Sequence, residues 1–243
     1  MKSIFSIIAI VLLVVITITI ISSCKNKGKK NRIVSMQNRP VTSFSSISIE
    51  GTFPVELSQS GENEWVKVEA DDKLQELILV HNDGDQLIIE MKEDVSLSKT
   101  KKVKVYINFK NIHELNFNSV GNLNNSGILK LDSLELNSES VGKLDLNLEG
   151  KFLRANLKSV GVTNLSGIVD EVRINNKSIG ALHAYGLKAK NLMIHNTSVG
   201  IAEVYADSTF HIRSSAIGNL YYKGPGAIKE LNSEGIGKVE QRN

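Results

Sequence analysis

The side chains best suited to chemistry lie in the last third of the chain, two residues apart or about twenty apart. They are one histidine, one glutamate and three tyrosines, namely His183, Tyr185, Glu203, Tyr205 and Tyr221. Proteins bind sugars with such groups, because aromatic rings stack on apolar faces while nearby polar groups fix the orientation. We therefore predict a ligand-binding stripe here. The alternative is that these side chains are ordinary cross-strand packing pairs.

Candidate catalytic groups are few. Asp145 and Glu203 are expected to face outward two coils apart, about 10 Å by strand spacing, with Asn164 between them. This distance is close to the carboxylate separation of inverting glycosidases, roughly 6.5–9.5 Å, so a carbohydrate-active enzyme is an alternative hypothesis. The serines offer no Gly-x-Ser-x-Gly turn for a nucleophile. We predict a protein that is not an enzyme and has no catalytic residues.

Metal, cofactor and nucleic-acid sites are also not expected. The chain has five histidines and one cysteine, without a His-Glu-x-x-His motif or a cysteine pair, so we predict neither a metal site nor a cofactor. The net charge is only +3, and much of it comes from a basic segment over residues 25–32. That segment contains no aromatic residues, which argues against nucleic-acid binding.

A short internal repeat must position the candidate stripe. A glycine returns at steps of 21, 19, 19, 20, 18 and 19 residues, preceded each time by Val or Ile. Such a period indicates one small structural unit stacked on copies of itself. The triplets are Ser119-Val120-Gly121, Ser140-Val141-Gly142, Ser159-Val160-Gly161, Ser178-Ile179-Gly180, Ser198-Val199-Gly200, Ala216-Ile217-Gly218 and Gly235-Ile236-Gly237.

Within each repeat, apolar residues recur two apart, which is the period of a strand. Leu144 and Leu146 follow one glycine by two and four residues, and Leu134 and Leu136 precede it by eight and six. A coil of about nineteen residues is too short for a crossover helix. We therefore predict an all-β fold, a parallel β-helix or β-solenoid, in which residues three and five after each glycine face outward. Adjacent coils should then bring His183 near Glu203 and Tyr185 over Tyr205. Asparagines five residues before the glycines are expected to form a ladder.

The rest of the chain suggests an envelope protein with an anchor. Residues 1–24 resemble a lipoprotein signal peptide, with an apolar stretch over 4–21 and a lipobox that ends at Cys24, the expected lipidation site. The alternative is that residues 4–22 remain as a membrane helix. We expect a flexible basic linker over 25–40, an irregular β-rich start of the solenoid over 41–112, and regular repeats over 113–240.

These features together resemble the putative auto-transporter adhesin, head GIN domain family. The resemblance rests on the glycine triplets, on the opening segment 47–57, on Leu87-Ile88-Ile89 and on Tyr221-Tyr222-Lys223-Gly224, and it covers roughly residues 42–240. This chain has Val or Ile where the family usually has Ser or Gly before the repeated glycine. The resemblance implies a right-handed β-helix and an envelope location, and it supplies no catalytic residues.

We therefore predict a non-catalytic lipoprotein of the cell envelope, expected at the outer membrane and held there by its N-terminal lipid anchor. It would act as an adhesin or binding module through a lateral face of the solenoid. The expected partner is a surface polysaccharide or an envelope protein. A purely structural envelope protein is a further alternative, beside the carbohydrate-active enzyme.

Overall fold

The computed structural model describes residues 34–92 and 103–243. The predicted signal peptide, the lipidation site at Cys24 and the linker up to residue 33 lie outside the described residues. Residues 34–243 form one compact unit. Its strands are β1 (Val34–Arg39), β2 (Ser46–Gly51), β3 (Val55–Gln59), β4 (Trp65–Asp71), β5 (Ile78–Asp83), β6 (Gln86–Met91), β7 (Lys104–Phe109), β8 (Glu114–Ser119), β9 (Leu123–Asn125), β10 (Leu129–Ser138), β11 (Val141–Leu157), β12 (Val160–Asn176), β13 (Ile179–Asn196), β14 (Val199–Ser214), β15 (Leu220–Lys223), β16 (Ala227–Ser233) and β17 (Val239–Gln241).

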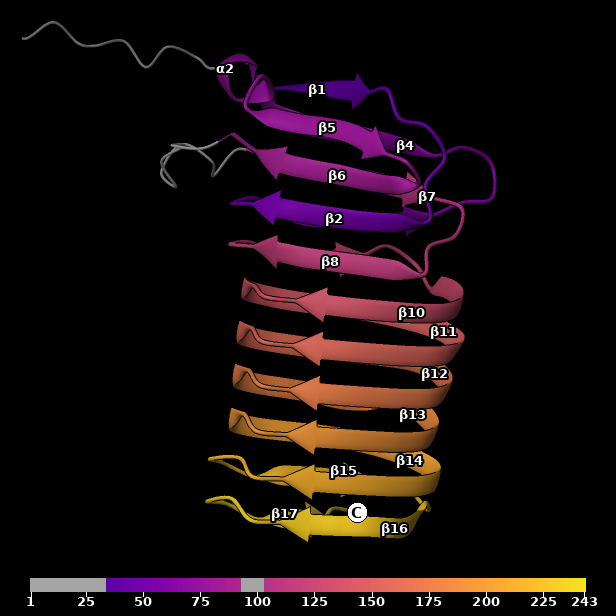
Figure 1. Ribbon diagram of the computed structural model, residues 1–243, viewed down its shortest axis with the longest axis vertical. Helices are drawn as coiled ribbons and strands as arrows, with labels where there is room; N and C mark the ends of the chain where they lie inside the picture. Colours follow the sequence, from indigo (N-terminus) through magenta and orange to yellow (C-terminus); the bar gives the residue numbers. More distant parts are fainter. Residues whose placement is uncertain (1–33, 93–102) are drawn as a thin grey trace, which may run out of the picture. The chain divides into compact units, whose positions relative to one another are not determined.

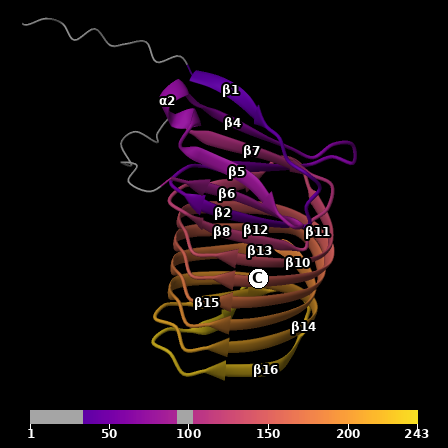
Figure 2. The same ribbon diagram turned by 45° about the horizontal axis from the view of Figure 1, so that its top comes forward.

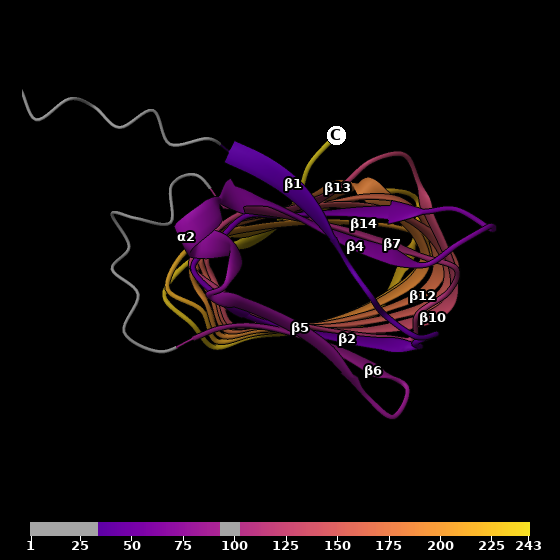
Figure 3. The ribbon, with the colours of Figure 1, turned by 90° about the horizontal axis from the view of Figure 1, so that it is seen from above.

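The repeats form a β-solenoid, which confirms the predicted fold class. Strands β10 to β14 follow one another as stacked coils, each paired in parallel with the next (Figure 1). Equivalent repeat positions meet in register, as where Val160 pairs with Ile179 and Gly161 with Gly180. Seen along the stack, the coils form a flattened ring with two broad sides (Figure 3). A residue of one repeat therefore lies directly above its counterpart in the next.

The alternation of apolar residues fills the interior, as the strand period predicts. Leu144 and Leu146 from one broad side and Leu134 and Leu136 from the other are at most 2% exposed. Near the C-terminal end, Tyr222 packs its ring edge-on against Phe210, with the ring centroids 5.3 Å apart. The buried apolar side chains join into one continuous cluster from the first coil to the last.

The N-terminal region continues the stack and then covers its end. β2 pairs in parallel with β6 and β8, and β3 pairs in parallel with β7 and β9. Above them β4 runs antiparallel to β7, β5 runs antiparallel to β6, and the short helix α2 (Asp72–Gln75) lies beside them (Figure 2). The 41–112 region therefore carries the atypical, antiparallel end of the solenoid.

One boundary differs from the sequence-based expectation. Residues 34–39, which we placed in the flexible linker, form β1 and pair antiparallel with β4. Most side chains of β1 are exposed. This strand is held by backbone pairing at a sheet edge rather than by burial. Its only apolar alternation is Val34 and Met36, which are exposed and too short a pattern to predict a strand.

The repeated glycines form a column in which neighbouring coils approach closely. A Cβ atom built on Gly180 would lie 1.9 Å from the carbonyl oxygen of Gly161, and one on Gly200 equally close to that of Gly180. From Gly142 onward, the glycines of the triplets also have φ between +130° and +149°. Side chains rarely adopt this conformation. Two independent constraints therefore restrict these positions to glycine.

Replacing a glycine of this column should destabilise the whole stack. We expect Gly180→Ala to lower the free energy of unfolding by about 2–5 kcal/mol, because the new methyl group meets a backbone oxygen and the positive φ is strained. Gly61→Ala is the matched control, since nothing lies within 4 Å of its Cβ position. Its effect should stay within about 0.5 kcal/mol. Chemical denaturation measures both; equal losses would contradict this explanation.

Candidate ligand-binding face

The predicted stripe belongs to a continuous row of outward-facing side chains on one broad side of the solenoid. Its members are register partners from strand to strand, and we call this row the polar ladder. The strands that carry it run from β7 through β3 and β9 to β11–β15 and β17. The polar ladder consists of Tyr106, Glu56, Asn124, Asp145, Asn164, His183, Glu203, Tyr221 and Glu240.

The centre of the predicted stripe is a contact between a histidine and a carboxylate. His183 on β13 is the register partner of Glu203 on β14, and its Nδ1 lies 2.5 Å from Oε2 of Glu203. The side chains are 46% and 25% exposed. The sequence predicted this neighbourhood from the repeat alone. The contact places a hydrogen-bonded imidazole and carboxylate at the surface, where both remain accessible to a ligand.

Tyr185 lies at an irregularity that the sequence spacing encodes. The step from Gly180 to Gly200 is 20 residues, and the pairing of β12 with β13 shifts between Asn164 and Ser166. Two residues of β13, one of them Tyr185, therefore oppose a single residue of β12, which is a β-bulge. Burial raises the pKa of Tyr185 to about 12, with a smaller contribution from the negative charge of Glu203. Its hydroxyl therefore stays neutral and can donate a hydrogen bond.

The bulge also corrects one expectation. We expected Tyr185 to lie over Tyr205 in the next coil, but the pairing of β13 with β14 shifts after Ala184 and resumes only at Ala189. Tyr205 instead has Lys223 as its register partner. The segment around Tyr185 departs from the coil below, because the bulged chain follows a wider path than the strict repeat assumes.

Cationic side chains cover the tyrosine rings, which the sequence analysis missed. Nζ of Lys188 lies 3.5 Å from the ring centroid of Tyr205, and Nζ of Lys223 lies 4.8 Å from that of Tyr185. The guanidinium of Arg242 lies 4.2 Å from the ring of Tyr221. Such cation–π contacts join residues distant in sequence. Lys223 and Arg242 each follow a repeat glycine by five residues and could have been placed from the repeat, whereas Lys188 could not.

The tyrosine hydroxyls are also engaged. Tyr205 donates to Oδ1 of Asp207 at 2.8 Å, and Asn219 donates through Nδ2 to the hydroxyl of Tyr221 at 2.7 Å. These hydrogen bonds fix the rings relative to the strands that carry them. The site thus combines aromatic, cationic and carboxylate groups whose polar atoms already contact one another.

The carboxylate pair considered for glycosidase chemistry does not have the expected spacing. Asp145 pairs with Asn164, Asn164 with His183, and His183 with Glu203. Asp145 and Glu203 are thus three coils apart and not two, or roughly 14 Å at the ordinary strand spacing. This exceeds the roughly 9.5 Å limit for inverting enzymes. The geometric argument for a glycosidase at this pair is therefore wrong.

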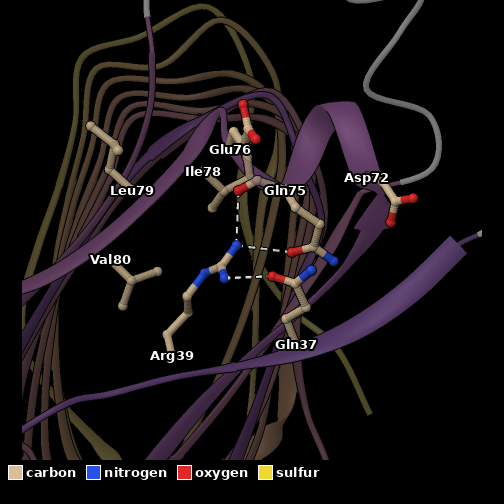
Figure 4. A pocket seen from close by; sticks show the side chains of 8 residues that line it. All are labelled: Gln37, Arg39, Asp72, Gln75, Glu76, Ile78, Leu79 and Val80. Atoms are coloured by element: carbon tan, nitrogen blue, oxygen red, sulfur yellow. Dashed lines mark hydrogen bonds between the residues drawn. The ribbon is translucent and has the colours of Figure 1, made fainter.

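A separate hollow at the N-terminal cap is lined from β1, α2 and β5 (Figure 4). In it, the guanidinium of Arg39 donates to Oε1 of Gln37 at 2.8 Å and to the backbone oxygen and Oε1 of Gln75 at 2.8 and 2.9 Å. The guanidinium thus ties β1 to α2. Over residues 34–92 and 103–243, no group of three or more His, Cys, Asp or Glu side chains could hold a metal ion.

Comparisons with known proteins agree with this architecture. Residues 43–226 match the family described as putative auto-transporter adhesin, head GIN domain. A crystal structure of a putative adhesin from Bacteroides fragilis has a TM-score of 0.82 at 22% identity and covers 87% of this chain and 98% of that one. At 22% identity, this structural similarity establishes a shared fold and nothing about a shared function. No curated protein sequence matches the chain.

Two further solved structures share the fold at lower similarity. A putative lipid binding protein from Parabacteroides distasonis has a TM-score of 0.61 at 18% identity, with 86% of this chain and 98% of that one covered. A putative adhesin from Parabacteroides merdae has a TM-score of 0.59 at 21% identity, with coverage of 88% and 98%. The solenoid thus occurs in several proteins of divergent sequence.

The raised pKa of Tyr185 can be tested by spectrophotometric titration. We expect one tyrosine to ionise near pH 12 in the folded protein, and Tyr185→Phe to remove that step. Folding favours the neutral hydroxyl, so the stabilisation is complete below about pH 10, the ordinary tyrosine value, and is lost as the pH rises through about 12. In denaturant the late step should disappear. A late step that survives Tyr185→Phe would contradict the assignment.

Proposed function

Because the chain belongs to the head GIN domain family of putative auto-transporter adhesins, we propose that it is a non-catalytic binding module of the cell envelope. The proposed binding surface is the C-terminal half of the polar ladder with its neighbours, formed by His183, Tyr185, Glu203, Tyr205 and Tyr221. The single observation that carries this proposal is that three tyrosines and a histidine–glutamate pair share one accessible side of consecutive coils. We call this surface the tyrosine face.

The proposed ligand is a polysaccharide that carries acidic groups. Lys188 and Lys223 lie over tyrosine rings, so a sugar that approaches these rings meets an ammonium group first. The carboxylates of the face have partners of their own, as Asp207 accepts from Tyr205 and Glu240 lies 3.1 Å from Arg242. A uronic acid or sulfated sugar would satisfy both the cations and the rings, whereas a neutral sugar would leave the cations without a new partner.

We further propose that the protein is held at the membrane by lipid attached to Cys24. The support is the sequence alone, where an apolar stretch precedes Ser22, Ser23 and this cysteine. In the part of the chain that the structure describes, no helix is long and apolar enough to cross a membrane.

Binding to arrayed polysaccharides tests the proposal on the full chain in detergent micelles. We expect acidic polysaccharides to bind and neutral ones to bind weakly, with affinity falling as salt is raised. Replacing the aromatic contacts in the double variant Tyr185→Ala/Tyr205→Ala should lower affinity at least tenfold.

The control is Phe152→Ala, which removes a half-buried aromatic side chain that also has a cation partner, Arg173, but lies away from this face. It should bind like the unchanged protein. If the double variant binds normally, or if no acidic polysaccharide binds at all, the tyrosine face is not the binding site that we propose.

A further inference from the structure

The residue before each repeat glycine forms an exposed apolar row along one narrow edge of the solenoid. We call it the β-branched ridge. Its members pair from coil to coil, through the ladders of β11–β14 and through isolated bridges at both ends. Every one of these side chains is between 44% and 76% exposed. The β-branched ridge consists of Val120, Val141, Val160, Ile179, Val199, Ile217 and Ile236.

At this edge the usual distribution of side chains is reversed: polar side chains are buried and apolar ones are exposed. The serines that precede the ridge are buried, as at Ser140 and Ser159, whose hydroxyls are 3.0 Å apart. Polar side chains thus point inward while Val and Ile point to solvent. Scattered exposed apolar residues are normal, but a contiguous row over seven coils, roughly 29 Å long at ordinary strand spacing, is typical of an interaction surface. The edge lies where β10 ends and β11 begins (Figure 1).

We propose that the β-branched ridge binds the same ridge of a second copy of this chain, with the two solenoids side by side and their axes parallel. Both ridges have the same coil spacing, so their side chains stay in register over the full length. A two-fold axis parallel to the stack brings each coil against the same coil of the partner. The ridge residues then meet in a continuous apolar seam.

The charges beside the ridge favour this arrangement. In the parallel pair, the position two residues before the ridge faces the position two residues after it in the same coil of the partner. Glu139 of one copy therefore faces Lys143 of the other, and Glu234 faces Lys238. The symmetry makes each ion pair twice.

The central coils have no acidic residue at either position. There Lys158 and Lys177 face Val162 and Ala181 of the partner, so their ammonium groups meet no like charge in the same coil. Val162 and Ile201, which are 37% and 43% exposed, add aliphatic contact.

An antiparallel pair centred on Ile179 lacks this match. It would place Glu139 opposite Ser215 and Lys143 opposite Asn219, so that neither charge gains an opposite one. Within one chain, Glu139 already contacts Lys158, and Lys143 lies 2.5 Å from Asp145. These pairs are exposed, and exposed ion pairs contribute little, so they can share or exchange partners when two copies meet.

Cysteine cross-linking tests both the contact and its direction. The full chain in detergent micelles carries Cys24→Ser, so that each introduced thiol is the only one. Val120→Cys, Ile179→Cys and Ile236→Cys sample the two ends and the middle of the ridge. A short bismaleimide should give a covalent dimer with all three, at a yield at least fivefold above that of the control Met193→Cys. Met193 is similarly exposed, at 46%, but lies away from the ridge, on the broad side opposite the polar ladder.

A charge exchange provides a second readout that does not depend on the thiols. Lys143→Glu should weaken dimerisation at least fivefold in analytical ultracentrifugation, and Glu139→Lys in the same chain should restore it. Cross-linking at Ile179→Cys alone would indicate an antiparallel pair and overturn the proposal. Cysteine variants of the ridge that stay monomeric and do not cross-link would overturn it too. This holds even if the ridge then binds vesicles of anionic lipid, which would indicate a membrane contact instead.

Discussion

Backbone contact between successive coils at the glycine column sets the spacing and alignment of the stack. With carbonyl oxygens about 2 Å from where a Cβ would lie, and with φ positive from Gly142 onward, the chain turns there in a way open only to glycine. Each turn then lies directly on the previous one. The parallel ladders, the buried Leu and Val columns and the outward rows all inherit their alignment from this contact.

Alignment has a direct consequence for the surface. In a strict stack, any repeat position becomes a row, so the surface chemistry of this protein is arranged in columns rather than in pockets. The asparagine side chains show this locally: Asn137 donates to Asn116, and Asn156 donates to Asn137. The tyrosine face and the β-branched ridge are two such columns, one aromatic and charged, the other aliphatic. Both are extended, which suits polymers and other solenoids better than small molecules.

Departures from the strict repeat are as informative as the repeat. The 20-residue coil accommodates its additional residue as a bulge at Tyr185, and this is where the aromatic and cationic side chains of consecutive coils gather. β-Bulges commonly re-aim side chains at functional sites. A uniform coil would have aligned Tyr185 with Tyr205. The irregular coil thus distinguishes the tyrosine face from the other coils of the same broad side.

The sequence by itself determined the all-β solenoid, the inward columns and the neighbourhood of His183 and Glu203, because a fixed period converts sequence spacing directly into position along the stack. It could not place the ammonium group of Lys188 on the ring of Tyr205, since Lys188 lies outside the outward positions that the repeat defines. The two-coil separation expected for Asp145 and Glu203 was a miscount, because the glycines at 142, 161, 180 and 200 already place three steps between them, as the ladder register shows. The sequence did not predict strand β1, because pairing at a sheet edge uses backbone groups that every residue has. Only the tertiary structure decided which side chains face solvent at the turn. There the serines are buried and the neighbouring Val and Ile are exposed, because the chain bends at the glycine that follows them.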